Sequence, residues 1–191
     1  MAITSQVVPS KLRHLQSFTS SGNFYPPAGT TTVFVSVHGA SGGGGGGNAR
    51  YGYTPGGNGG TGIITGGYVQ VNPQAPHGIT IGAGGNAGPN NTYPTNTGAA
   101  GGTGGTTIFD GAISVFGGAG GNGGGADTGG GNAGATGSTS QVTALTTLNP
   151  SASALPRVSG NTTSGTTVAG GTRSGSTPLA GTAGIVHIYG Y

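Results

Sequence analysis

Apolar and polar residues alternate along several short stretches of the chain. Between Val33 and Val37 every second residue is valine, and the intervening positions are Phe34 and Ser36. A repeat of two places successive side chains on opposite faces of a β-strand, so this pattern predicts a strand with one buried face. By the same reading, strands are predicted at 15–18, 31–38, 62–71, 78–82, 105–109, 112–117 and 183–190.

Helical patterns are nearly absent. No stretch carries an apolar stripe at helical spacing, and only 142–148 has the composition of one short helical turn. We therefore predict a mainly β fold with almost no helix, in which the first and last strands lie in the body of the sheet. The segment from about Ala135 to Pro178, rich in Ser and Thr, is predicted to be an irregular insert.

Glycine-rich tracts separate the predicted strands, at 41–47, 56–62, 83–88, 98–105 and 117–134. The chain has 48 glycines in 191 residues, against an average usage of about 7%. Within the tracts the other residues recur at intervals of three, as Asn58 and Thr61 do, and Ala83 and Asn86. A flexible linker has no reason to keep that period, whereas the extended polyproline II helix has three residues per turn.

An isolated helix of this type satisfies none of its backbone hydrogen-bonding groups. Helices built of glycine can approach closely enough to pair those groups laterally, which satisfies the requirement that buried backbone groups be bonded. We therefore predict that the tracts pack side by side as polyglycine II segments anchored by the strands. Flexible loops are the alternative interpretation.

Charge is scarce along the chain, and this limits the functions that are open to it. The chain has two acidic residues and no cysteine, so neither a disulfide framework nor a thiolate metal site is expected. Nucleic-acid binding needs clustered cations, and the five here are dispersed: Lys11, Arg13, Arg50, Arg157 and Arg173. We predict no nucleic-acid partner. The first twenty residues lack an apolar signal-peptide core, and no stretch approaches the length of a membrane span.

Candidate catalytic and metal-binding residues are few. Lys11, the only lysine, lies outside any phosphate-binding glycine motif. His38 and His187 would be cross-strand neighbours if the first long strand pairs with the last, yet two histidines without a carboxylate make a weak metal site. Asp110 precedes glycine in Phe-Asp-Gly-Ala, which is a hairpin-turn signal. We predict no cofactor, no metal and no enzymatic activity.

The order of strands and glycine tracts along the chain is similar to that of a known family. The stretch F-T-S-S-G-N-F-Y-P-P-A-G-T-T-T-V-F-V-S-V-H-G-A-S-G-G-G-G-G-G resembles the glycine-rich domain of bacteriophage minor tail proteins. The similarity continues in G-G-Y-V-Q-V-N-P, G-I-T-I-G-A-G-G-N-A-G, G-G-T-G-G-T-T-I-F-D-G-A-I-S-V-F-G-G-A-G-G and A-G-I-V-H-I-Y. It excludes the first seventeen or so residues and the Ser/Thr-rich insert. Similar arrangements occur in phage tail-fibre-tip adhesins and in anaplastic-lymphoma-kinase-type receptor ectodomains.

The resemblance implies a jelly-roll-like β-sandwich set against a polyglycine II bundle. It also implies a non-catalytic bacteriophage virion component, made in the host cytoplasm without a signal peptide. The family has no motif of functional residues that can be transferred position by position. We predict that the chain consists of an N-terminal arm at 1–14 and a glycine-rich β domain at 15–191.

Two surfaces are predicted from the residues themselves. Aromatic rings beside Asn and Arg suit saccharide contact, so we expect a host-contact surface made of Arg50, Tyr51, Tyr53, Asn91 and Tyr93. Alternatively, these tyrosines cap the bundle. The N-terminal arm carries three apolar residues that are predicted to dock on another virion subunit within a symmetric homo-oligomer: Val7, Val8 and Leu12. A disordered terminus is the alternative for the arm.

Two classes of function therefore compete. The first is a minor tail protein with a structural role in the virion, which is the role that the resemblance favours. The second is an adhesin at the tail tip that binds glycans on the host surface, which the tyrosines favour. Capsid decoration is a further alternative.

Overall fold

A computed structural model describes residues 12–48, 54–90, 97–125, 162–164 and 178–190. In these residues the chain forms two antiparallel sheets and no helix, which confirms the predicted mainly β fold. The predicted helical turn at 142–148 lies outside the described residues.

The first sheet has five strands in the order β1-β9-β3-β4-β8. These are β1 (Arg13–Phe18), β9 (Ile185–Gly190), β3 (Thr32–His38), β4 (Gly62–Gln70) and β8 (Thr162–Ser164). The second sheet has four strands in the order β2-β5-β6-β7. These are β2 (Gly22–Phe24), β5 (His77–Thr80), β6 (Thr107–Phe109) and β7 (Ile113–Val115). Strand β8 was not predicted and falls inside the Ser/Thr-rich insert.

The two terminal strands differ from the prediction in one respect. Strand β9 lies inside the first sheet, between β1 and β3, as predicted, but β1 lies at the edge. Its side chains explain this position, because only Leu15 and Phe18 of β1 are packed against the core and both stay partly exposed. A strand with so little apolar surface needs only one paired neighbour.

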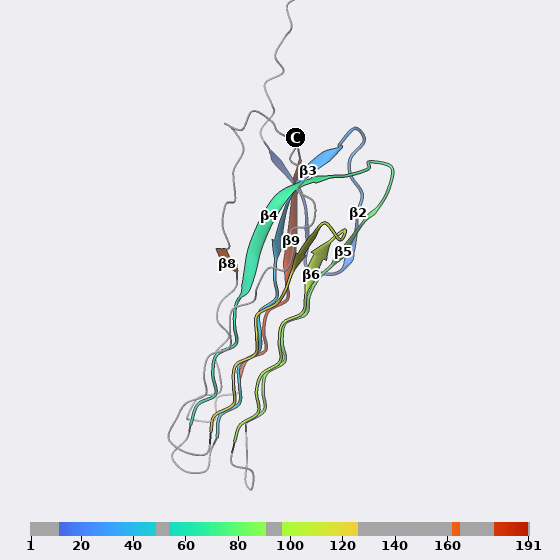
Figure 1. The fold of residues 1–191 in the computed structure, drawn as a ribbon. Helices are drawn as coiled ribbons and strands as arrows, with labels where there is room; N and C mark the ends of the chain where they lie inside the picture. Colours follow the sequence, from blue (N-terminus) through green and yellow to red (C-terminus); the bar gives the residue numbers. More distant parts are fainter. Residues whose placement is uncertain (1–11, 49–53, 91–96, 126–161, 165–177, 191) are drawn as a thin grey trace, which may run out of the picture.

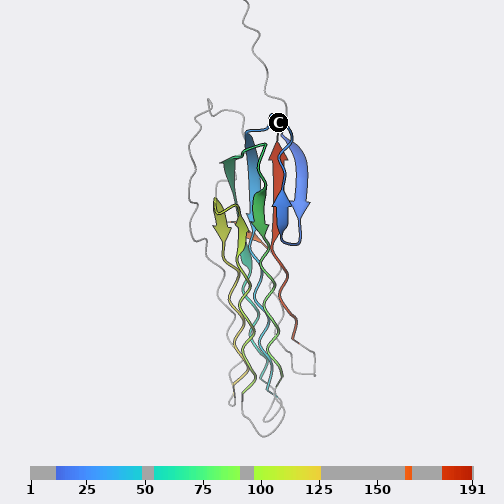
Figure 2. The same cartoon turned by 90° about the vertical axis from the view of Figure 1, so that its right-hand side faces the viewer.

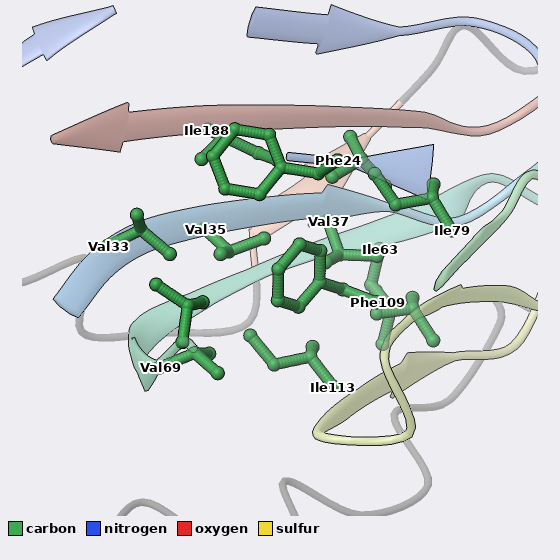
Figure 3. Close-up of a cluster of buried hydrophobic side chains, with 13 residues drawn as sticks. Phe24, Val33, Val35, Val37, Ile63, Val69, Ile79, Phe109, Ile113 and Ile188 are labelled. Carbon is green, nitrogen blue, oxygen red and sulfur yellow. The ribbon is translucent and has the colours of Figure 1, made fainter. Parts of the chain in front are cut away.

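The hydrophobic core lies between the two sheets. Val33, Val35 and Val37 of β3 are fully buried, so the valine alternation correctly identified the inner face of this strand. Figure 3 shows these valines meeting Phe109 and other apolar side chains. The core also contains Phe24, Ile63, Val69, Val71, Ile79, Ile113, Val115, Val186 and Ile188. Each such side chain contributes about 1.5–3 kcal/mol by leaving water. The arrangement is compatible with a β-sandwich.

Six glycine-rich segments extend from the strands and run together away from the sheets (Figures 1 and 2). We call this set the glycine bundle, and its segments are 39–48, 54–61, 82–90, 97–106, 116–125 and 178–184. Each segment leads into or out of a strand. The segment 39–48 directly continues β3, and 178–184 leads directly into β9.

The segment 39–48 is the centre of the bundle, and all of its residues are buried. Its backbone amides donate in three directions in turn, each direction recurring at every third residue. Gly42 and Gly45 donate to 54–61, Gly43 and Gly46 to 97–106, and Ser41 and Gly44 to 178–184, over 2.8–3.0 Å. Its carbonyl groups accept from the two remaining segments, 82–90 and 116–125. One segment is thus bonded to all five others, whereas a strand in a flat sheet has two bonded neighbours.

Side-chain exposure follows the same repeat. Ala83, Asn86 and Pro89 are exposed, while Gly85 and Gly88 on the same segment are buried. On the segment 82–90 the larger residues therefore lie on the outside of the bundle at every third position. This exposure pattern explains the interval of three that the sequence shows.

Glycine is required inside the bundle because neighbouring backbones touch where a side chain would begin. A Cβ atom added at Gly43 would overlap the carbonyl oxygen of Asn86, and one added at Gly45 would overlap that of Asn122. These obstacles are backbone atoms, which cannot rotate away as a flexible side chain can. A substitution must push two hydrogen-bonded segments apart.

We expect Gly43→Ala to lower the free energy of unfolding by about 3 kcal/mol or more, since even ordinary overpacking costs about 1–3 kcal/mol. Gly78→Ala is the matched control, because Gly78 lies in β5, is exposed, and has no atom within 4 Å of an added Cβ. Denaturant unfolding of both variants measures the difference. Equal stability of the two variants would contradict the close backbone packing.

Candidate functional site

The residues that the sequence predicts as a host-contact surface belong to two connections of the glycine bundle. Arg50, Tyr51, Tyr53, Asn91 and Tyr93 themselves lie outside the described residues. The structure does describe the chain on both sides of each connection, so it shows where the two connections begin and end. Val7 and Val8 also lie outside the described residues, and Leu12 is partly buried.

The flanking residues meet at the end of the bundle that lies away from the sheets, which we call the distal end (Figure 1). Asn48 and Thr54 flank 49–53 and form an isolated β-bridge, with the Asn48 amide donating to the Thr54 carbonyl over 2.9 Å. The backbone amide of Gly47 donates to the side-chain oxygen of Asn90 over 2.8 Å, and Asn90 directly precedes 91–96. The two connections thus start from neighbouring points.

A third segment joins this contact. The Gly125 carbonyl accepts hydrogen bonds from the side-chain amide of Asn48, over 3.1 Å, and from the hydroxyl of Thr54. The amide of Gly98, which follows 91–96 closely, donates to Gly124 over 2.8 Å. The distal end is therefore a hydrogen-bonded base, and the two connections that contain the predicted contact residues start and end at it.

A second cluster lies on the outer face of the five-stranded sheet. Val186 and Ile188 of β9 point into the core, so the alternating His187 and Tyr189 face outward. His38 of β3 contacts His187 edge-on, with ring centroids 5.1 Å apart. The predicted pairing of these strands is confirmed, although the direct partner of His187 is Ser36 rather than His38.

A third imidazole in β1 completes this cluster, which we call the histidine row: His14, His187 and His38. The hydroxyl of Ser17 lies 2.7 Å from His14 Nε2 and 2.7 Å from His187 Nδ1. A hydroxyl has one proton, so Ser17 donates to one ring and accepts from the other when both rings are neutral. The rings of His14 and His187 have centroids 6.2 Å apart.

The environment of the row disfavours positive charge. Burial, together with the neighbouring His187, lowers the pKa of His38 below its ordinary value of 6.5. Burial also lowers the pKa of His187, with a second contribution from His14. Both causes act in the same direction, because each penalises the imidazolium form.

Aromatic rings continue the row across the sheet. His14 contacts Tyr189 edge-on at 5.4 Å, Tyr189 lies 6.2 Å from Phe34, and Phe34 contacts Tyr68 of β4 at 5.2 Å. The outward surface of four strands thus carries a connected set of rings. Edge-to-face contacts of this kind add about 0.5–1.5 kcal/mol beyond burial.

The second sheet contains a histidine–carboxylate pair. His77 Nδ1 lies 2.6 Å from Asp110 Oδ2, and the ring stacks on Phe109. The carboxylate can only accept, so Nδ1 donates and Nε2 of the neutral ring accepts the Asn72 amide over 3.0 Å. Both nitrogens are therefore held by the protein. The pair resembles part of a hydrolytic triad, but its geometry is that of a structural link between two turns.

Asp110 is positioned by the turn that the sequence predicted. Asp110 and Gly111 have φ values of 47° and 67°, and the amide of Ala112 donates to Phe109 over 2.8 Å. Two consecutive residues with positive φ are typical of the tight hairpin turns that favour Asp-Gly. The prediction of a hairpin at Phe-Asp-Gly-Ala is confirmed.

Metal sites and membrane-spanning helices can be assessed for the described residues. Among them, no group of three or more His, Cys, Asp or Glu side chains has the arrangement of a metal site. No helix in this part of the chain is long and apolar enough to cross a membrane. In comparisons with known proteins, no family model matches the chain and no curated sequence shows significant similarity to it.

We expect His77→Ala to lower the free energy of unfolding by about 2–3 kcal/mol, because it opens a gap beside Phe109 and removes the acceptor of the partly buried Asn72 amide. Gln74→Ala is the control, since Gln74 lies in the same turn with an exposed side chain. Thermal or denaturant unfolding measures both. A loss below about 0.5 kcal/mol for His77→Ala would show that the link is not structural.

Proposed function

We propose that this protein is a non-catalytic structural component of a bacteriophage virion, most closely similar in role to a minor tail protein. The observation that carries the proposal is the bonding of 39–48 to all five other bundle segments. Such a bundle is stiffened by backbone hydrogen bonds in several directions and presents small, uncharged residues outward. The bundle is suited to extending a particle, and few charged or reactive side chains lie along its length.

The same proposal includes two finer features of the fold, which are polyglycine II packing of the bundle and a jelly-roll class for the sheets. The three-residue repeat of hydrogen bonds and exposure supports polyglycine II packing. So does the backbone, because among the described glycines only Gly29 and Gly111, which both lie outside the bundle, have positive φ, and the left-handed extended helix needs negative φ. The jelly-roll class is supported by the family resemblance.

The partners that we propose are other virion subunits, in a symmetric homo-oligomer, with no cofactor. The N-terminal arm is the proposed docking element. Residues 13 and 14 of the predicted arm belong to β1, and Leu12, the first residue that the structure describes, directly precedes that strand, so the arm is attached to the edge of the first sheet. That position leaves one side of β1 facing away from the sheet, where a neighbouring subunit has access to it.

The test of the structural role is a search for the protein in purified phage particles. We expect it at a fixed ratio to the major tail protein, and we expect deletion of residues 1–12 to reduce its incorporation by about tenfold or more, because the apolar arm no longer docks. Gly78→Ala, which alters an exposed and uncrowded position, is the control with normal incorporation. Absence of the wild-type chain from particles would reject the proposal, and normal incorporation of the deletion variant would reject docking by the arm.

A second function is favoured by the distal end. The connections 49–53 and 91–96 leave from neighbouring points on a rigid base, and binding residues are often placed on connections held by a rigid scaffold. We propose as the alternative that this end binds a saccharide of the host surface through Arg50, Tyr51, Tyr53, Asn91 and Tyr93. In this case the protein is an adhesin at the tail tip.

For the adhesin role, the change Tyr51→Ala with Tyr53→Ala is expected to weaken binding of the purified protein to whole host cells by about tenfold or more. Tyr25→Ala is the matched control, because Tyr25 is 68% exposed and lies beside β2, among the sheets. Fluorescently labelled protein and cell sedimentation measure the affinity. Undiminished binding by the double variant rejects these tyrosines as the contact, while leaving the structural role to be judged by incorporation.

A further inference from the structure

The histidine row crosses three adjacent strands of the first sheet diagonally, because His14 pairs with Tyr189, and His38 pairs with Ile185 rather than with His187. His14 belongs to β1, His187 to β9 and His38 to β3. The ring of His187 lies between the other two and contacts both. The Ser17 hydroxyl bridges the first two rings over 2.7 Å on each side. The row therefore couples the edge strand to the centre of the sheet through groups that change charge near neutral pH.

Among the described residues, no carboxylate forms an ion pair with His14 or His187. The whole chain has only two acidic residues, Asp110 and Asp127. Asp110 is in the second sheet and is paired with His77, and Asp127 lies outside the described residues.

The other titratable groups near the row do not compensate either. In β1, Arg13 is the chain neighbour of His14 and adds positive charge. Tyr189 of β9 and Tyr68 of β4 face the same surface, and phenols stay neutral at acidic pH. Side chains of β8 are not described. Acidification therefore concentrates positive charge on this surface.

Strand β1 is the element that this charge would displace most easily. Among the strands that the structure describes it pairs with β9 alone, and the pairing register shifts between His14 and Gln16. Its side chains are mostly exposed, and Leu15 and Phe18 are only partly buried against the core. By contrast, β9 and β3 are held on both sides and contribute fully buried residues.

We propose that β1 is an acid-releasable strand: protonation of His187, which contacts His14 and His38, drives β1 from the edge of the sheet. The proposal rests on the geometry of the row and holds whether or not the protein is a virion component. If the arm docks on a partner, acidification would alter that contact by freeing the strand to which the arm is joined.

The direction of the pH effect follows from the pKa of each buried ring. His38 and His187 have pKa values below the ordinary 6.5 in the folded protein, so the unfolded or released form binds protons more tightly. Their contribution to stability is complete above about pH 6.5 and is lost as the pH falls through the lower folded-state values. Release on acidification, rather than on alkalinisation, is the expected sign.

The experiment measures amide hydrogen exchange of the full chain at pH 7.5 and pH 5.0, after correction for the intrinsic pH dependence of exchange. We expect protection of β1 to fall by up to about tenfold for each pH unit between the ordinary pKa of 6.5, which applies after release, and the lower folded-state pKa, when one proton is taken up on release. Protection of β3 and β4, which lie inside the sheet, is the internal reference and should change less.

Two variants distinguish charge from a general loss of stability. The change His14→Gln with His187→Gln keeps polar side chains that can bond Ser17 but cannot become cationic, and it should remove most of the pH dependence of β1. Gln16→Ala, in the same strand but outside the row, should keep it. Equal protection of β1 at both pH values in the wild type overturns the proposal. So does a pH-dependent loss that persists undiminished in the histidine double variant.

Discussion

Pairing of the backbone groups of 39–48 is the constraint on which the rest of the structure depends. This segment is buried along its whole length and has almost no side chains to pack, so its stability has to come from hydrogen bonds between main chains. A buried amide or carbonyl left unpaired costs about 1–3 kcal/mol. A single partner strand would satisfy one direction only. Five neighbouring segments satisfy three directions of donation and two of acceptance.

The two sheets anchor the glycine segments and so help a chain this rich in glycine to form the bundle. Glycine loses more conformational freedom on folding than any other residue, so an isolated bundle would be costly to order. Strand β3 fixes the start of the central segment through three fully buried valines. The ladder between β3 and β4 continues without a break into the bundle, because His38 pairs with Ile64 and the Gly39 amide then donates to Ile63. The register of the β3–β4 pair therefore fixes which residues of 39–48 and 54–61 are bonded to each other.

Sequence reasoning succeeded where a feature depends on the residue's own neighbours in the chain. The valine alternation identified the buried face of β3, the Asp-Gly pair identified the hairpin turn at Asp110, and the interval of three identified the outward positions of the glycine segments. Each of these is a local geometric rule with a fixed period or a fixed backbone conformation. Seven strands were located in this way before any partner was known.

Features that depend on partners far away in the chain were not predicted. Ser17 and His187 are 170 residues apart, and a register shift in β1 brings His14 into the same row. His77 and Asp110, 33 residues apart, meet only because β5 pairs with β6. The edge position of β1 likewise follows from the strand order and not from its own sequence. That the connections 49–53 and 91–96 start from neighbouring points is likewise evident only from the flanking hydrogen bonds.

The division between sheets and bundle also determines where sequence change can alter function. Inside the bundle, an added side chain at a position such as Gly43 meets a neighbouring backbone, so variation there is limited to the exposed third positions. The distal end is different, because side chains of Asn48 and Thr54 join its segments by bonding the Gly125 carbonyl. Surface connections in general tolerate substitution and insertion far better than the elements that they join. In a protein of this design, sequence change beyond that base can therefore leave the hydrogen bonds inside the bundle intact.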